Sequence, residues 1–201
     1  MTKPYNETVL GAIVASALTQ SRKLGLVAKN AFAEFDTAAL LQNASFRFRT
    51  IEDVETLAPV VSAYFPDPRK TIFGLRELML NAVEHGNLGI TYAEKSKLVL
   101  AGTWATEVHR RLRLPENEQK FASLAIEIRG SELAVTIRDQ GRGFQWSDYL
   151  DFSPSRAADP NCRGIAMSRA VAFPSMMYSG NGNEVICYAP RIRRSAVHSS
   201  S

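Results

Sequence analysis

Four polar side chains lie on one predicted helix at spacings that suit chemistry. Glu77, Asn81, Glu84 and His85 stand at positions i, i+4, i+7 and i+8, so on an α-helix they share one face. A carboxylate and a carboxamide one turn apart suit magnesium, a hard cation that takes oxygen ligands and keeps several waters. The Asn81 amide oxygen can ligate the metal, and Glu77 can accept a proton from a neighbouring water or hydroxyl. Alone, the pattern is equally that of a solvated helix face.

A second candidate segment follows an alternating stretch that ends at Ile137. The chain there reads RDQGRGF, from Arg138 to Phe144. Asp139 at a strand end, followed by Gly141 and Gly143, places an acceptor beside backbone that can approach a ligand closely. A buried carboxylate at this point can accept a hydrogen bond from an adenine amino group. The alternative is an ordinary aspartate–glycine turn.

A third candidate segment is NCRGIAM, residues 161–167, a loop that leads into a predicted helix. Amide groups at a helix N-terminus point at an anion, and the helix dipole adds to the attraction. Arg163 supplies a charge-assisted contact if that anion is a phosphate. Alone, this motif is weak.

The order and spacing of the three segments are more specific than any one of them. The strings ELMLNAVEHGN, DQGRGF and RGIAMSRAV resemble the asparagine box and the two glycine boxes of the ATPase superfamily of gyrase, heat-shock chaperones, histidine kinases and mismatch-repair proteins. The chain is most similar to the anti-sigma-factor serine kinases, which act in bacterial partner switching. The resemblance covers about residues 45–189.

The resemblance implies a domain that binds ATP with Mg²⁺ between the asparagine-box helix and a mobile lid. It implies that Asn81 holds magnesium and that Glu77 is the general base, which deprotonates a serine or threonine hydroxyl on a partner protein. Asp139 would contact adenine, and Gly141 and Gly143 would let the backbone approach the nucleotide. The other expected nucleotide-binding residues are Glu84, His85, Phe144, Arg163, Gly164 and Ile165. For His85, packing at a helix end is the alternative.

The function expected from this resemblance is that of a serine/threonine protein kinase that acts on an anti-anti-sigma-type partner. The alternative is an anti-sigma module that binds ATP and a partner such as a sigma factor without phosphotransfer. Retention of Glu77 and Asn81 favours catalysis, whereas Ala166, where many relatives have a second glycine, favours the alternative. The catalytic half of a histidine kinase is less favoured, because no dimerising helix pair with a phosphoacceptor histidine precedes residue 45.

The N-terminal segment carries a separate resemblance. The string TKPYNETVLGAIVASAL is similar to the end of a response-regulator receiver domain, in which a lysine–proline step, here Lys3 and Pro4, leads into the last helix. The alternatives are a helix that packs on the ATP-binding domain and a helix that joins two copies in a homodimer. We therefore expect a helical segment at 1–43, an ATPase domain at 44–190 and a disordered tail at 191–201.

The order of predicted elements indicates the fold class. Thr50 and Asp53 resemble a capping box, which predicts one helix start. Asp67 before Pro68 predicts the start of the next helix, and Gly86, in the left-handed conformation, is expected to end that helix. Predicted strands cover 46–48, 124–128, 133–137, 177–179 and 184–188, and predicted helices cover 50–64, 67–85, 92–113 and 164–173. We expect an α/β (α+β) two-layer sandwich: a mixed, mainly antiparallel sheet covered on one face by helices.

Composition narrows the function classes. The chain has 201 residues, of which 45% are hydrophobic and 22% charged, as in ordinary globular domains. No apolar run is long enough for a membrane span, and two cysteines, Cys162 and Cys187, fit reduced thiols in the cytoplasm. The net charge of +4 comes largely from basic clusters at 109–113 and 191–194, which lack interleaved aromatic residues. A nucleic-acid partner is therefore not expected.

Overall fold

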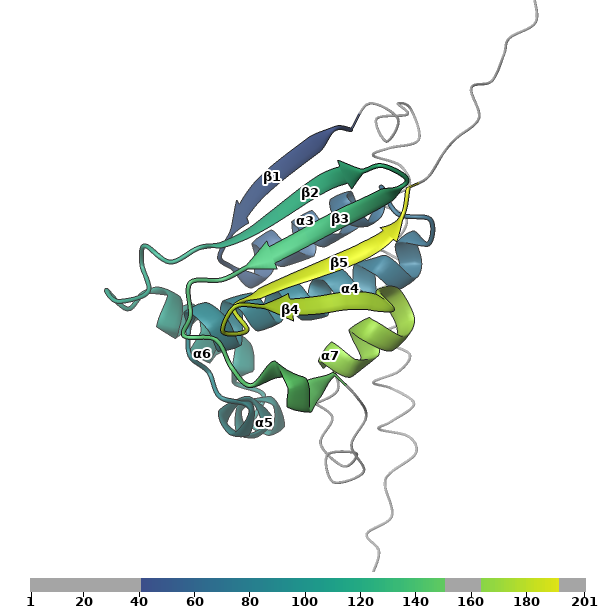
Figure 1. The fold of residues 1–201 in the computed structure, drawn as a ribbon. Helices are drawn as coiled ribbons and strands as arrows, with labels where there is room; N and C mark the ends of the chain where they lie inside the picture. The colour runs from purple at the N-terminus through teal and green to yellow at the C-terminus, as the bar shows by residue number, and fades with distance from the viewer. Residues whose placement is uncertain (1–40, 151–163, 192–201) are drawn as a thin grey trace, which may run out of the picture.

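The computed structural model describes residues 41–150 and 164–191, which form an antiparallel sheet with helices packed on one face (Figure 1). The five strands lie in the order β1-β2-β3-β5-β4, and each neighbouring pair is antiparallel. The predicted two-layer α+β sandwich is confirmed. The strands are β1 (Asn43–Phe48), β2 (Ala122–Arg129), β3 (Glu132–Arg138), β4 (Ser175–Ser179) and β5 (Glu184–Pro190).

The helix-covered face of the sheet carries the core. Strand alternation puts every second side chain on this face, and the register aligns them in rows across the sheet. One row runs through Phe46, Leu124, Ile137, Val185 and Tyr178 on successive strands. The three aliphatic side chains of this row are nearly fully buried. Ile137 in this row is the second-last residue of β3, so the core lies close to the loop that follows this strand.

Helices α3 (Ile51–Ser62) and α4 (Pro68–Asn81) begin where the capping residues predict. Thr50 accepts a hydrogen bond from Asp53 N at 3.0 Å, and the Asp53 carboxylate accepts one from Thr50 N at 3.0 Å, which completes a capping box. Asp67 caps α4 through Lys70 N, with Pro68 in the first turn. Both helices bury one apolar stripe against the sheet, so their orientation is fixed by packing.

The predicted end of α4 at Gly86 is wrong. The helix continues without a break into a short π-helix, η1 (Ala82–Asn87), in which Leu88 N donates to Val83 O five residues back. Gly86 lies inside this turn, and Gly89, with φ of 62°, is the left-handed glycine that follows it. Within this wider turn, Gly86 packs against another part of the chain, as described below.

The predicted single helix over 92–113 is two helices, α5 (Tyr92–Leu100) and α6 (Trp104–Leu112), separated at Gly102, where φ is 67°. Figure 1 shows both beyond the end of the sheet at which β3 stops. Helix α6 buries Val108 and Leu112, whereas α5 buries no residue fully. We call α5 and α6 together the helical insertion.

The remaining predicted elements are present. The turn between β2 and β3 has Gly130 at φ 64°, and Gly180 and Gly182 lie in the turn between β4 and β5. The predicted helix near 164–173 is α7 (Gly164–Met167), continued by a π-turn, η5 (Ser168–Ala172), and η2 (Trp146–Tyr149) is a short 3₁₀ turn.

Several expectations fall outside the described residues: the N-terminal helical segment and most of the C-terminal tail, together with Cys162. The domain boundaries at 43/44 and 190/191 therefore stay predictions. In the described ranges, no helix has the length and apolar character that crossing a membrane requires.

Loss of the α3 capping box tests whether local capping contributes to the stability of the sandwich. Thr50→Ala should lower the free energy of unfolding by about 1 kcal/mol, because Asp53 N loses its acceptor. Urea unfolding followed by circular dichroism measures this. The control is Thr56→Ala, at an exposed position within the same helix. An equal loss in both variants would contradict a specific role for the cap.

Candidate functional site

A cavity of about 380 Å³ lies between the end of α4, η1, the loop after β3 and the β4–β5 turn. Its volume is in the range of small-molecule sites. Five of the residues predicted to bind the cofactor line it: Asn81, His85, Asp139, Gly143 and Phe144. Its walls also include the apolar side chains Leu78, Ile90, Ile137 and Val185. The asparagine segment and the first glycine segment, far apart in the sequence, therefore meet at one cavity.

Asp139 is held in place by hydrogen bonds with Asn183 and Gly141. Its N–H donates to Asn183 O at 3.0 Å, and Asn183 Nδ2 donates to Asp139 O at 3.2 Å. One carboxylate oxygen, Oδ1, accepts a hydrogen bond from Gly141 N at 2.7 Å. Burial raises the pKa of the Asp139 carboxyl to about 6, although the Gly141 hydrogen bond opposes this shift. The second oxygen is left to accept a hydrogen bond from a ligand in the cavity.

Gly86 lies against this carboxyl group. A Cβ at Gly86 would lie within 2.6 Å of both Asp139 oxygens, so no side chain fits there. Gly141 meets the same turn from the other side, since a Cβ on it would overlap with the Gly86 carbonyl. Sequence reasoning treated Gly86 as a helix terminator and missed this contact. A glycine inside a helical pattern, at a place where helix propensity disfavours it, was the available signal.

Both glycines of the DQGRGF segment lie so close to the backbone of another segment that a side chain would not fit. Gly143 has φ of 76°, and a Cβ on it would overlap with Asn181 O in the β4–β5 turn. Phe144 N donates to the same carbonyl at 3.0 Å. The expectation that both glycines let the backbone approach a nucleotide stays a prediction. Both are needed for chain packing, and of the two only Gly143 also lines the cavity.

Asn81 and Glu77 lie one turn apart on α4, as predicted, but only Asn81 lines the cavity. Within the described part of the chain, the Asn81 amide forms no hydrogen bond with another residue, so its oxygen is available as a ligand atom. Glu77 is partly buried, and its Oε2 lies against Gly164 at the start of α7. A Cβ at Gly164 would overlap with that oxygen. The absence of a side chain at Gly164 thus leaves the space that the Glu77 carboxylate occupies.

Glu84 does not share the cavity with Asn81 and His85. It is fully buried, and Lys95 Nζ of α5 lies 2.8 Å from its Oε2. Burial raises the pKa of Glu84, and the charge of Lys95 acts in the opposite direction. The structure gives Glu84 a connecting role between η1 and the helical insertion. Ile165 is also buried in the core and lies away from the cavity lining, and Arg163 falls outside the described residues.

His85 is a neutral side chain of the cavity wall. Burial lowers the pKa of its imidazole to about 4. Nδ1 lies close to Ile90 O, so Nδ1 carries the proton and donates. The ring packs on Tyr92, with centroids 4.1 Å apart. His85 therefore combines the predicted cavity position with the alternative packing role.

Three aromatic side chains in the wall, Tyr92, Tyr149 and Tyr178, were not predicted, and they gather around Phe144, which was. Tyr92 stacks on Tyr149 with ring centroids 4.9 Å apart, and Phe144 contacts both Tyr149 and Tyr178 edge-on. All four line the cavity. The sequence offered no signal, because Tyr92 begins a predicted surface helix and Tyr149 lies in a predicted loop. Flat aromatic faces suit the binding of a flat heterocyclic ring.

Among the described residues, no group of three or more His, Cys, Asp or Glu side chains gathers as a metal site.

Comparison of the chain with known protein families found no match, and a search of curated proteins found no significantly similar sequence.

Titration of Asp139 gives a test that needs no ligand. Because burial raises its pKa to about 6, the ionised carboxylate destabilises the folded protein, and stability is lost as the pH rises from about 4 to about 6. Asp139→Asn should therefore melt at a higher temperature than the wild type at pH 8, and the difference should shrink at pH 5. The titration of His85 cancels in this comparison, since both proteins contain it. A variant that melts at or below the wild-type temperature at pH 8 would contradict the assignment.

Proposed function

We propose that the chain binds ATP with Mg²⁺ in this cavity. The observation that carries the proposal is the Asp139 carboxylate, which faces the cavity with one oxygen already bonded and the other left to accept. An adenine amino group is a donor of the right kind for that oxygen. Asn81 lies one helical turn before His85. It lines the same cavity and offers an amide oxygen to a metal. Aromatic and aliphatic walls suit the purine.

We propose further that the ATP serves a serine/threonine protein kinase of the partner-switching type. Asn81 would be the protein ligand of Mg²⁺, which neutralises phosphate charge when bound. Glu77 would take the proton of a partner's hydroxyl group as that oxygen attacks the γ-phosphorus and ADP leaves. The resemblance of the three motifs supports this reading. So does the position of Glu77 one turn from Asn81, with its carboxylate against Gly164.

The partner would be an anti-anti-sigma-type protein, a sigma factor or both, in the bacterial cytoplasm. Cys187, a fully buried thiol, fits a reducing compartment.

The rival function is an anti-sigma module that holds ATP and a partner without phosphotransfer. The observation that favours it is Ala166, which is buried in α7 where many relatives of the resembled branch have a glycine.

Nucleotide binding is the first test. Mg-ATP at millimolar concentration should raise the melting temperature of the wild type, because a ligand of the folded state stabilises it by mass action. Asp139→Asn should cost on the order of 1–3 kcal/mol of binding, since an amide presents a donor to the adenine amino group. Asn81→Ala should remove the magnesium dependence of binding. Calorimetric titration of the three proteins decides: equal affinities would show that the nucleotide is wrongly placed.

The transfer step is tested at Glu77. Glu77→Gln keeps the shape but cannot take the proton, so ATP affinity should stay within a few-fold. Phosphate transfer to the partner should fall by about a hundredfold or more. Gly164→Ala is the matched variant, because its methyl group displaces the Glu77 carboxylate without removing it, and it should slow transfer in the same direction. Transfer is measured with radiolabelled ATP and candidate partners. A wild type that binds ATP and transfers nothing favours the rival, and undiminished transfer in Glu77→Gln ends the general-base assignment.

A further inference from the structure

The helical insertion lies beside the cavity and contacts its edge. Residues 88–91, which we call the rim loop, connect η1 to α5, and Gly89, Ile90, Thr91 and the following Tyr92 all line the cavity. Ile90 N donates to Glu84 O at 2.9 Å. The carbonyl groups of Leu88 and Gly89 have a different partner, which comes from α6.

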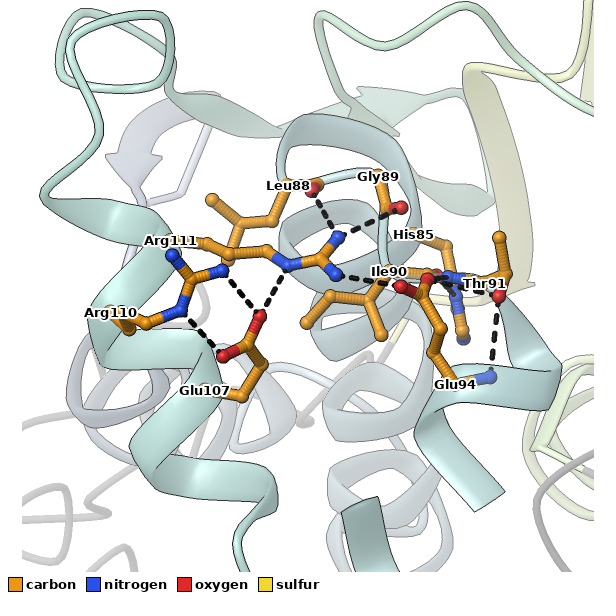
Figure 2. Close-up of polar contacts among 9 residues, drawn as sticks. All are labelled: His85, Leu88, Gly89, Ile90, Thr91, Glu94, Glu107, Arg110 and Arg111. Atoms are coloured by element: carbon orange, nitrogen blue, oxygen red, sulfur yellow. Dashed lines mark hydrogen bonds and ion pairs between the residues drawn. The ribbon is translucent and has the colours of Figure 1, made fainter. Parts of the chain in front are cut away.

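That partner is Arg111, whose guanidinium group contacts three separate parts of the chain (Figure 2). Nη1 donates to Leu88 O at 3.2 Å and to Gly89 O at 3.1 Å. Nη2 donates to Glu94 Oε1 at 2.8 Å, and Nε donates to Glu107 Oε1 at 2.8 Å. The Arg111 side chain is only 17% exposed, whereas its partner Glu94 is 45% exposed. A planar guanidinium can form such a set, whereas an ammonium group cannot.

Glu94 extends the effect of Arg111 to the start of α5. Its other oxygen, Oε2, accepts a hydrogen bond from Thr91 N at 2.8 Å, and Thr91 Oγ1 accepts one from Glu94 N at 3.2 Å. This capping box fixes the first turn of α5, which begins with Tyr92. The Tyr92 ring lies between the His85 and Tyr149 rings. Arg111 is thus connected through Glu94 to the cavity's aromatic wall.

The apolar packing of helix α5 includes Leu98, which is partly buried against the core. None of its residues is fully buried, and Leu100 at its end is almost wholly exposed. Its other strong attachment is the ion pair of Lys95 with buried Glu84. Leu88 and Ile90 of the rim loop are anchored in the apolar core, whereas exposed Gly89 and the first turn of α5, with Tyr92, are also held by polar contacts.

We propose that Arg111 is a positioning residue of the nucleotide site: it holds the rim loop and Tyr92 in the shape that binds ATP. The proposal rests on the proposed function. Without Arg111 the carbonyl groups of Leu88 and Gly89 lose the hydrogen-bond donor that the described part of the chain gives them, and the first turn of α5 loses its ion pair to α6. Apparent affinity falls in proportion to the population of the competent shape. If that shape is held for a tenth of the time, the Kd for ATP rises about tenfold.

The test compares Arg111→Met with Arg110→Met. Arg110 is the matched control, because it contacts Glu107 at 2.7 and 2.8 Å, is 58% exposed and has no contact with the rim loop in the described residues. In the free protein, Arg111→Met should speed amide hydrogen exchange in residues 88–95 and leave the exchange of β2 and β3 unchanged. Arg110→Met should exchange like the wild type.

Calorimetric titration of Mg-ATP, well below the melting temperature, gives the second measurement. The Kd of Arg111→Met should rise about tenfold, with Arg110→Met unchanged. A role in stability alone would lower the melting temperature of Arg111→Met and leave the Kd of the folded protein unchanged, which would overturn the proposal. Equal exchange and affinity in the two variants would also overturn it.

Glu94→Gln keeps the proposal testable if Arg111→Met does not fold. The amide can still accept from Thr91 N, but it loses the ion pair with Arg111. It should produce a smaller change of the same sign in both measurements, and wild-type values would contradict the proposal. A wild type that binds no ATP defeats the proposed function. An ATP-binding wild type with unchanged affinity in Arg111→Met defeats only the role of Arg111.

Discussion

The carboxyl group of Asp139 lies against the Cα of Gly86, and this contact joins the end of β3 to the turn that follows α4. A side chain at either Gly86 or Gly141 would overlap with the other segment. Asn87 strengthens the junction, since its Oδ1 accepts a hydrogen bond from Gln140 N at 2.8 Å. Because backbone meets backbone here, the loop after β3 has little freedom to shift. The cavity opens on the side of Asp139 that this junction leaves uncovered.

Burial also determines the direction in which the pKa values of the ionisable side chains at the site are shifted. The pKa values of Asp139 and Glu84 are raised and that of His85 is lowered, so each shift favours the neutral form. Glu84 has an ion-pair partner in Lys95, which makes it part of the structural connection to α5. Asp139 has no cationic partner among the described residues. A shielded carboxylate without a counter-charge costs stability, and such groups are common at functional sites.

The cavity has two walls of different physical origin. The sheet and α4 form one wall, held by apolar side chains of the core such as Leu78 and Ile137. The rim loop and α5 form the other, in which the buried side chains Leu88 and Ile90 are supplemented by the polar contacts of Arg111, Glu94 and the Glu84–Lys95 pair. Close packing makes the first wall stiff. The second wall responds to the loss of single polar contacts, so changes in nucleotide affinity without global unfolding are expected there.

The amino-acid sequence determined the local structure to a large extent. The capping residues Thr50 and Asp67 mark the observed helix starts, and alternation marks the strands, because both signals come from neighbours in the chain. It also predicted which segments meet: Asn81, His85 and Asp139, separated by up to 58 positions, line one cavity. Their roles toward a nucleotide remain predictions.

Tertiary structure decided what depends on distant contacts. Gly86 meets Asp139, and the helix widens into η1, so that Glu84 lies with Lys95 instead of with Asn81. The glycines after Asp139 lie against the backbone of segments distant in the sequence, and no local pattern reveals such contacts. From the sequence alone, Arg111 is not distinguished from its neighbours Arg110 and Arg113, which form one basic cluster with it. Only the folded chain brings its guanidinium to carbonyl groups 22 and 23 residues earlier, because that contact depends on how α6 packs.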